Sequence, residues 1–213
     1  FCTVIWGTTF IAQETGMEKI GPYTFNAVRF FGGFIALIPL YLIVEKSGTK
    51  KIISKGKNRF LYLSILIGVF LFLASVFQQV ALLYTDVANA AIFTIFYVLI
   101  VPAISYFLFS KRIHWSVWPS VFVCIIGGFL LTETNNVKVR LGDSLVLIGA
   151  FFWALHIVYL SKFLKLFNYP IAITMGACLI ESIIAFIPSL IFENITLGNL
   201  LLETNELLHA GVL

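Results

Sequence analysis

Long apolar segments separated by short polar ones fill almost the whole 213-residue chain. A helix of about 20 apolar residues crosses the roughly 30 Å hydrocarbon core of a bilayer. Because lipid offers the backbone no hydrogen-bond partners, such segments are helical. The pattern therefore predicts seven membrane-spanning helices, over residues 1–13, 22–44, 60–84, 87–109, 115–131, 142–160 and 169–192.

Both ends of the chain lie beside apolar runs. The first predicted span begins at Phe1, without a preceding polar segment. After Asn194 comes a polar stretch with LLLETNELL, which is typical of a short interfacial helix, and residues 210–213 would open an eighth span. These features predict that the chain is a piece of a longer membrane protein.

Composition strengthens the membrane interpretation. The chain is 60% hydrophobic and 11% charged, and its mean hydropathy is +1.01. A soluble domain of this length cannot hide so much apolar surface, so the fold class is an all-α polytopic membrane protein with the lipid bilayer as its partner. The net charge of +4 comes from basic loops, so it does not indicate a nucleic-acid partner.

Basic residues are distributed unevenly between these loops. Ten of the fourteen Lys and Arg residues follow the second, fourth and sixth predicted spans, and three lie in the opposite loops. The ten are Lys46, Lys50, Lys51, Lys55, Lys57, Arg59, Lys111, Arg112, Lys162 and Lys165, and the three are Lys19, Lys138 and Arg140. Because cytoplasmic loops retain positive charge, we expect the first set, and the N-terminus, to be cytoplasmic.

Matched residues suggest an internal repeat. A Trp and two Pro residues recur with similar spacing after about 147 residues, which is five predicted spans. The first copy has Trp6, Pro22 and Pro39, and the second has Trp153, Pro170 and Pro188. An odd number of spans per copy gives the two copies opposite orientations, an arrangement used by secondary transporters. Coincidence is the alternative, because Trp and Pro are common in membrane helices.

Several segments resemble one transporter family. WGTTFIAQ and PYTFNAVRFFGG are similar to the opening of an EamA-type domain of the drug/metabolite transporter superfamily, and GDSLVLIGAFFWALHIVYLSK is similar to the start of its second domain. The resemblance implies ten spans in two inverted five-helix repeats, with about seven present here. Residues 1–132 would hold the first repeat without its beginning, and residues 142–213 the front of the second.

Polar residues within the predicted spans are candidates for substrate binding, because they are costly to insert in a membrane. Glu14, Arg29, Gln78, Gln79 and Asn89 all lie in the predicted outer half. They predict a hydrated vestibule for a polar or zwitterionic solute, in which Glu14 pairs with Arg29. The alternative is a helix-packing network.

Two ionisable residues lie deeper. Glu181 is the only acid in the middle of a predicted span, and His156 lies at a similar depth. Burial disfavours the charged form of a carboxylate, so Glu181 is a candidate for coupling transport to a proton gradient, with His156 in the substrate site. The alternative for Glu181 is a protonated acid that only packs helices together.

Small residues suggest close helix contacts. Gly32 and Ala36 in the second predicted span, and Ala172 and Gly176 in the seventh, form small-xxx-small pairs. We expect both pairs to pack against neighbouring helices.

No enzyme or cofactor signature is present in the sequence. HExxH, GxSxG and P-loop motifs are missing, and the three cysteines lack metal-binding spacing. We therefore expect a secondary transporter that moves small metabolites, amino acids or amphipathic compounds by alternating access across a bacterial cytoplasmic membrane, without an enzymatic activity, cofactor or metal. A homodimer is compatible with the sequence. The alternatives are a seven-span receptor or sensor and a non-transport membrane scaffold.

Overall fold

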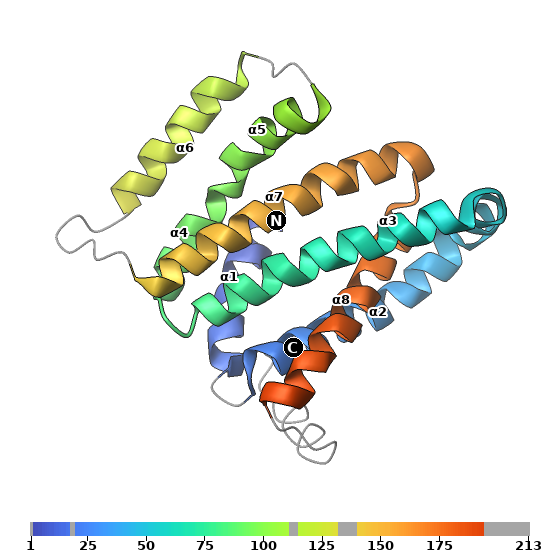
Figure 1. Cartoon of the computed structure of the whole chain (residues 1–213), viewed down its shortest axis with the longest axis horizontal. Helices are drawn as coiled ribbons and strands as arrows, with labels where there is room; N and C mark the ends of the chain where they lie inside the picture. Colours follow the sequence, from blue (N-terminus) through green and yellow to red (C-terminus); the bar gives the residue numbers. More distant parts are fainter. Residues whose placement is uncertain (1, 18–19, 111–114, 132–139, 194–213) are drawn as a thin grey trace.

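A computed structural model gives the structure of residues 2–17, 20–110, 115–131 and 140–193, and these residues are almost entirely helical (Figure 1). The helices are α1 (Cys2–Met17), α2 (Pro22–Val44), α3 (Lys46–Ala81), α4 (Val87–Ile95), α5 (Tyr97–Phe109), α6 (Val117–Leu131), α7 (Leu141–Phe167) and α8 (Pro170–Phe192). The predicted all-α fold is confirmed.

Five segments in the described residues are long and apolar enough to cross a membrane. They are Pro22–Val44, Gly56–Ala81, Val87–Leu108, Leu141–Phe167 and Pro170–Phe192. The third combines α4 and α5, which are separated only at Phe96, where the backbone stays close to helical (φ −58°, ψ −19°). The predicted first and fifth spans correspond to α1 and α6, which have 16 and 15 residues. The chain is therefore an integral membrane protein.

Two basic segments predicted as loops are helical. Residues 46–59 form the start of α3, which has non-helical backbone angles only at Gly56 (φ −149°, ψ 32°). Lys162 and Lys165 lie in the last two turns of α7, which we expected to end near residue 160. Lysine has a high helix propensity, and cations are favourable near a helix C-terminus, so a polar sequence did not mark the helix boundary.

Two antiparallel pairs form the centre of the structure, α2 with α8 and α3 with α7, and α3 also packs along α8 (Figure 1). Leu71, Ile67 and Phe163 belong to a buried cluster that also includes Ile173 and Ala177, so it joins α3, α7 and α8. We call the end of the bundle where α2 and α7 begin the Pro22 end. The opposite end, where α8 begins, is the Pro170 end.

Glycine allows α7 to approach α3 closely. A Cβ atom at Gly142 would lie 2.7 Å from Thr85 Cβ and 2.8 Å from the Ala81 carbonyl oxygen. At Gly149 it would lie 3.2 Å from the Ala74 carbonyl oxygen. The pair of small residues predicted at Ala172 and Gly176 also faces neighbours, because Ala172 is buried and a Cβ at Gly176 would contact Ser64.

The other predicted small-residue pair meets no neighbouring helix in the described residues. Gly32 and Ala36 are both exposed there, and a Cβ at Gly32 would have nothing within 4 Å. Spacing identifies one helix face without identifying what lies against it, so the packing of this pair stays a prediction.

Two glutamates join the ends of α2 and α8. Glu193, which follows α8, accepts hydrogen bonds from the backbone N–H of Tyr23 (2.8 Å) and Thr24 (2.9 Å) at the start of α2, and from the Thr24 hydroxyl. Glu45, which follows α2, accepts hydrogen bonds from the backbone N–H of Ile171 (3.0 Å) and Ala172 (2.8 Å) at the start of α8. Each carboxylate satisfies N–H groups that a helix N-terminus leaves without intrahelical partners.

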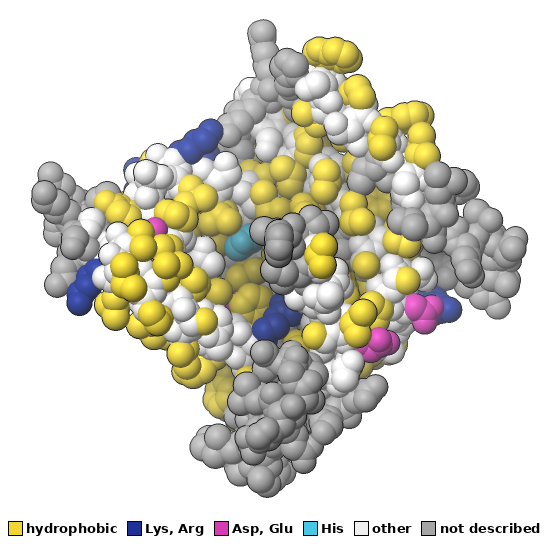
Figure 2. Space-filling model, turned by 180° about the vertical axis from the view of Figure 1, so that it is seen from behind, with side chains coloured by type: hydrophobic (Ala, Val, Ile, Leu, Met, Phe, Trp, Pro, Cys, Tyr) yellow, Lys and Arg dark blue, Asp and Glu magenta, His cyan; other side chains and the backbone are white. Residues whose placement is uncertain are grey.

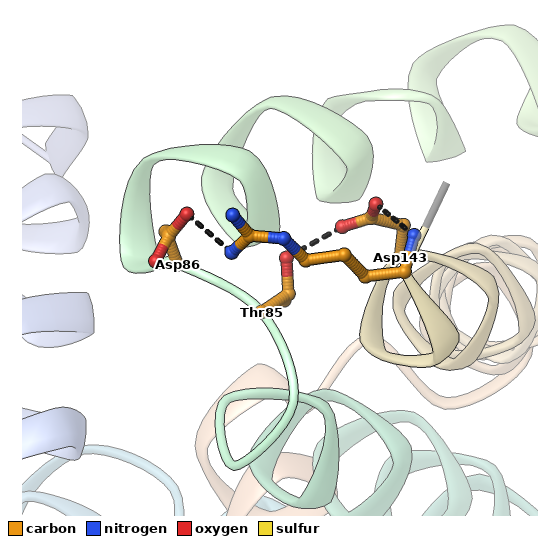
Figure 3. A network of polar contacts seen from close by, with 4 residues as sticks. Thr85, Asp86 and Asp143 are labelled. Atoms are coloured by element: carbon orange, nitrogen blue, oxygen red, sulfur yellow. Dashed lines mark hydrogen bonds and ion pairs between the residues drawn. The ribbon is translucent and has the colours of Figure 1, made fainter. Parts of the chain in front are cut away.

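A second polar network joins α4 and α7 at the Pro22 end (Figure 3). Thr85 donates a hydrogen bond to Asp143 (2.5 Å), which also accepts one from the backbone N–H of Arg140 (2.9 Å). The Arg140 side chain in turn forms an ion pair with Asp86 (2.5 Å) at the N-terminus of α4. This network fixes the start of α7 against the connection between α3 and α4.

Candidate functional site

Glu181 is the most deeply buried acid among the described residues. It lies halfway along α8 and has no exposed surface. Its Oε1 atom is 2.7 Å from the Ser75 hydroxyl of α3, whereas Oε2 has no hydrogen-bond partner in the part of the chain that the structure describes. Buried polar atoms almost always have partners, so the unpartnered oxygen is consistent with a bound proton, water or ligand.

Ser75 connects Glu181 to α3. Its hydroxyl donates a hydrogen bond to Glu181 and also lies 3.1 Å from the Phe72 carbonyl oxygen of its own helix. A hydroxyl has one hydrogen to donate, so the two acceptors share it.

Arg29 lies on α2 and contacts two aromatic rings. Its guanidinium carbon lies 4.7 Å from the centroid of the Phe30 ring and 5.9 Å from that of Phe25. The aromatic contacts stabilise the cation of this half-buried side chain. Glu181 and Cys178 of α8 lie within electrostatic range of Arg29, without an ion pair between Arg29 and Glu181 in the described residues.

The predicted pairing of Arg29 with Glu14 is not formed. Glu14 is exposed on α1, and no ion pair between the two residues occurs in the described structure. Glu14 therefore lies outside the buried cluster. The prediction failed because similar depth in the membrane does not place two side chains on facing sides of their helices.

Gln79 belongs to the same buried region as Glu181. It lies on α3 one turn after Ser75 and has no exposed surface. Its Nε2 atom makes a long 3.5 Å hydrogen bond to the Gln13 carbonyl oxygen, and its Oε1 atom has no partner among the described residues. Gln79 thus contributes a second unpartnered acceptor.

Asn26 was not predicted, yet it is the clearest polar anomaly on α2. It is fully buried, and neither Nδ2 nor Oδ1 has a hydrogen-bond partner in the described residues. Asn26 precedes Arg29 by one helical turn, so the two share one side of α2. The neighbouring residue Ala27 accepts a hydrogen bond from Ser182 (2.9 Å), which places Asn26 close to the turn of α8 that carries Glu181. The sequence signal that could have identified Asn26 is its position as a neutral polar residue within an apolar span.

Gln78 is part of an aromatic row rather than the Glu181 cluster. Its side-chain oxygen accepts a 2.9 Å hydrogen bond from the Trp153 indole of α7. The Trp153 ring lies 6.2 Å from Trp6 of α1, which stacks on Tyr97 of α5 at 5.9 Å. The predicted repeat partners Trp6 and Trp153 therefore contact each other directly.

His156 continues this row. Its ring lies 5.9 Å from that of Trp153 in an edge-to-face arrangement, and its Nδ1 atom lies 3.2 Å from the Ile67 carbonyl oxygen. A carbonyl oxygen only accepts, so Nδ1 is the donor in this hydrogen bond. The side chain is 8% exposed.

Asn89 does not join either group. It is half-buried on α4, and no hydrogen bond of its side chain is found within the described structure. The site therefore consists of a buried polar cluster on α2, α3 and α8, and an adjacent aromatic row on α1, α5 and α7. We call the first the Glu181 cluster and define it as Asn26, Arg29, Ser75, Gln79 and Glu181.

Figure 2 shows the side chains on one face of the molecule. This face is hollowed and mainly apolar, and a histidine and a basic side chain are visible within the recess. No group of three or more His, Cys, Asp or Glu residues that could hold a metal is found in the described residues. The arrangement suits an organic solute with polar and apolar parts.

Comparison with known proteins identifies a family. Residues 1–133 match the model of the EamA-like transporter family. An uncharacterized transporter of Archaeoglobus fulgidus is 28% identical over 166 residues, which cover 78% of this chain and 48% of the relative. A probable amino-acid metabolite efflux pump of Salmonella typhimurium is 27% identical over 211 residues, covering 94% of this chain and 62% of the relative.

A third relative, the uncharacterized transporter YoaV of Bacillus subtilis, is 26% identical over 165 residues, covering 74% of this chain and 53% of the relative. The chain thus spans about half to three fifths of the length of these relatives. No solved structure matches the chain significantly.

Proposed function

Because the chain belongs to the EamA-like transporter family, we propose that it moves a small zwitterionic metabolite across a cytoplasmic membrane by alternating access, with the Glu181 cluster as its binding and coupling site. The observation that carries the proposal is the set of unpartnered polar atoms on Asn26, Gln79 and Glu181. Family membership supports transport by the full-length protein over a receptor or scaffold role.

The chemistry of the cluster supports a zwitterion. Asn26, Gln79 and Glu181 each present an acceptor oxygen that has no partner in the described part of the chain, which suits the N–H groups of an ammonium. Arg29 presents a guanidinium, which suits a carboxylate. The name of the Salmonella relative, an amino-acid metabolite efflux pump, agrees with this substrate class.

Proton coupling is the second part of the proposal. Glu181 exchanges its proton when the site opens to water, and the charge of Arg29 or of the substrate then stabilises the carboxylate. The complete burial of Glu181 supports an acid that is shielded from water in the arrangement seen here. The cycle therefore couples substrate release to proton binding at the same carboxylate.

Alternating access is supported by the reciprocal contacts of α2 and α8. Each helix is capped by the glutamate that follows the other, as expected for two copies of one unit in opposite orientations. We propose that residues 1–132 and 142–213 belong to such inverted repeats. The basic Pro170 end is then cytoplasmic, in a bacterial inner membrane.

The decisive experiment compares Glu181→Gln with Glu14→Gln in proteoliposomes of the full-length protein. A panel of labelled amino acids is tested with and without an imposed pH gradient. We expect Glu181→Gln to lose at least tenfold in gradient-driven transport and to keep exchange down a concentration gradient. Glu14→Gln, which removes an exposed acid, should behave as the parent protein. Full proton-driven transport by Glu181→Gln would show that Glu181 only packs helices together.

A further inference from the structure

A basic cavity lies between α3 and α7 at the Pro170 end, away from the Glu181 cluster. Its volume is about 310 Å³, and Arg59 of α3 together with Lys162 and Lys165 of α7 lines it. All three basic side chains are exposed. None of the described residues that line the cavity is acidic.

The remaining wall is apolar and aromatic. Leu63, Tyr159, Phe163 and Leu166 contribute to it, and Phe163 is fully buried in the core shared by α3, α7 and α8. Lys165 also borders a second cavity of about 680 Å³, whose other lining residues lie on a different face of α7. Positive charge therefore sits at the rim of an apolar groove between α3 and α7.

The described lining of the cavity is basic and contains no acid. Glu45 is the one described acid at the Pro170 end; it accepts hydrogen bonds from the backbone of Ile171 and Ala172, and it does not line the cavity. Three basic side chains therefore lie next to an apolar surface.

We propose that this cavity binds an anionic phospholipid. The phosphodiester would lie against Arg59, Lys162 and Lys165, and an acyl chain would extend along the apolar wall toward the membrane interior. Basic pockets between membrane helices on the cytoplasmic side are suited to anionic head groups. The combination of charged rim and apolar wall fits an amphiphile better than a soluble anion, which would leave the wall uncovered.

The positive-inside distribution offers a simpler explanation for these residues, and the two accounts differ in a measurable way. A topology signal depends on total charge near the membrane and needs no particular position. A lipid site depends on the residues that line the cavity. Lys46 and Lys57 provide a matched control, because both are exposed at the same end and neither lines the cavity.

The test uses the purified full-length protein and native mass spectrometry. Phosphatidylglycerol is offered against phosphatidylcholine, and the retained lipid is measured for the parent, Lys162→Gln/Lys165→Gln and Lys46→Gln/Lys57→Gln. We expect the parent to prefer phosphatidylglycerol, the cavity variant to lose about tenfold or more of that preference, and the control to keep it. The expected loss follows from the contribution of each basic residue near an anionic surface.

Two soluble probes separate a lipid from a free phosphate. Neither inorganic phosphate nor glycerophosphoglycerol, the head group without acyl chains, should displace the lipid at millimolar concentration. Equal losses in both double variants, an absence of lipid preference in the parent, or displacement by either soluble probe would overturn the proposal. Arg59→Gln replaces the double variant if the latter does not fold.

Discussion

Glu45 and Glu193 form reciprocal helix caps, each at the N-terminus of the helix whose C-terminus leads into the other glutamate. Glu45 follows α2 and binds the start of α8, and Glu193 follows α8 and binds the start of α2. Both α2 and α8 begin with Pro at the first helical position, where a missing N–H costs nothing. The next two N–H groups of each helix donate hydrogen bonds to the capping glutamate.

The capping glutamates and the first prolines of α2 and α8 also occupy equivalent positions in the sequence. Glu45 and Glu193 are 148 residues apart, as are Pro22 and Pro170. A two-fold operation that exchanges antiparallel helices has its axis perpendicular to them, and so in the membrane plane. The contact pattern is therefore what an inverted repeat predicts at the ends of its second span.

The first prediction concerns these caps. Glu45→Ala and Glu193→Ala should each lower the free energy of unfolding by about 2 kcal/mol, because each leaves two helix N–H groups without a charged acceptor. Thermal unfolding of the purified full-length protein measures the change. Glu14→Ala is the control and should change stability little, since Glu14 is exposed. A loss confined to one of the two caps would contradict their equivalence.

The second prediction separates binding from stability at Asn26. Asn26→Leu should raise the free energy of unfolding by about 1 kcal/mol, because it removes a buried polar group that has no partner in the described structure. It should also raise the KM for substrate about tenfold, which corresponds to about 1.4 kcal/mol of lost binding. Thermal unfolding and proteoliposome transport report the two effects.

Ser182→Ala provides the opposite case. It removes a hydrogen bond to the Ala27 carbonyl oxygen, so it should lower stability by about 1 kcal/mol and leave the KM nearly unchanged. If Asn26→Leu lowered stability as well, Asn26 would have a structural partner and its assignment to the substrate site would fail.

The sequence predicted the membrane helices well where apolar runs are bounded by proline. The expected spans 22–44 and 169–192 agree with α2 and α8 to within one residue. The pattern failed between residues 46 and 59, because lysine-rich sequence is compatible with both a loop and a helix. The polarity of a segment indicates that it contacts water, but it does not indicate the backbone conformation.

The candidate site was predicted only in part, for a related reason. Depth along a helix selected Glu181, Arg29 and Gln79, which lie on the neighbouring helices α8, α2 and α3. It could not select the helix face, so it also included exposed Glu14. The capping role of Glu193 was not predictable from local sequence, since its partners lie 169 and 170 residues away.

The third prediction concerns the close approach of α3 and α7. Gly142→Ala should lower the free energy of unfolding by about 2 kcal/mol, because its Cβ would lie 2.7 Å from Thr85 Cβ and 2.8 Å from the Ala81 carbonyl oxygen. Gly32→Ala is a matched control on an open helix face and should be neutral or stabilising, since alanine favours helix. Similar losses in both variants would show that helix packing at Gly142 is not the cause.

The fourth prediction concerns orientation in the membrane. The described basic residues of α3 and the end of α7 lie at the Pro170 end, which positive charge assigns to the cytoplasm. Single cysteines are placed at Lys57 and Leu141 of the full-length protein after its native cysteines are replaced. Both positions are exposed and lie at opposite ends of the bundle. An impermeant maleimide added to intact cells should label position 141 and spare position 57.

Permeabilised cells supply the control for that experiment, because both positions should then react. Labelling of position 57 alone in intact cells would reverse the orientation. Glu45 would then cap α8 on the outer side and Glu193 would cap α2 on the inner side. The reciprocal caps would survive this reversal, because they depend on the contact between α2 and α8 and not on which end faces the cytoplasm. The phospholipid cavity at Arg59, Lys162 and Lys165 would face the outer leaflet instead, so the labelling result fixes the leaflet in which that lipid is to be sought.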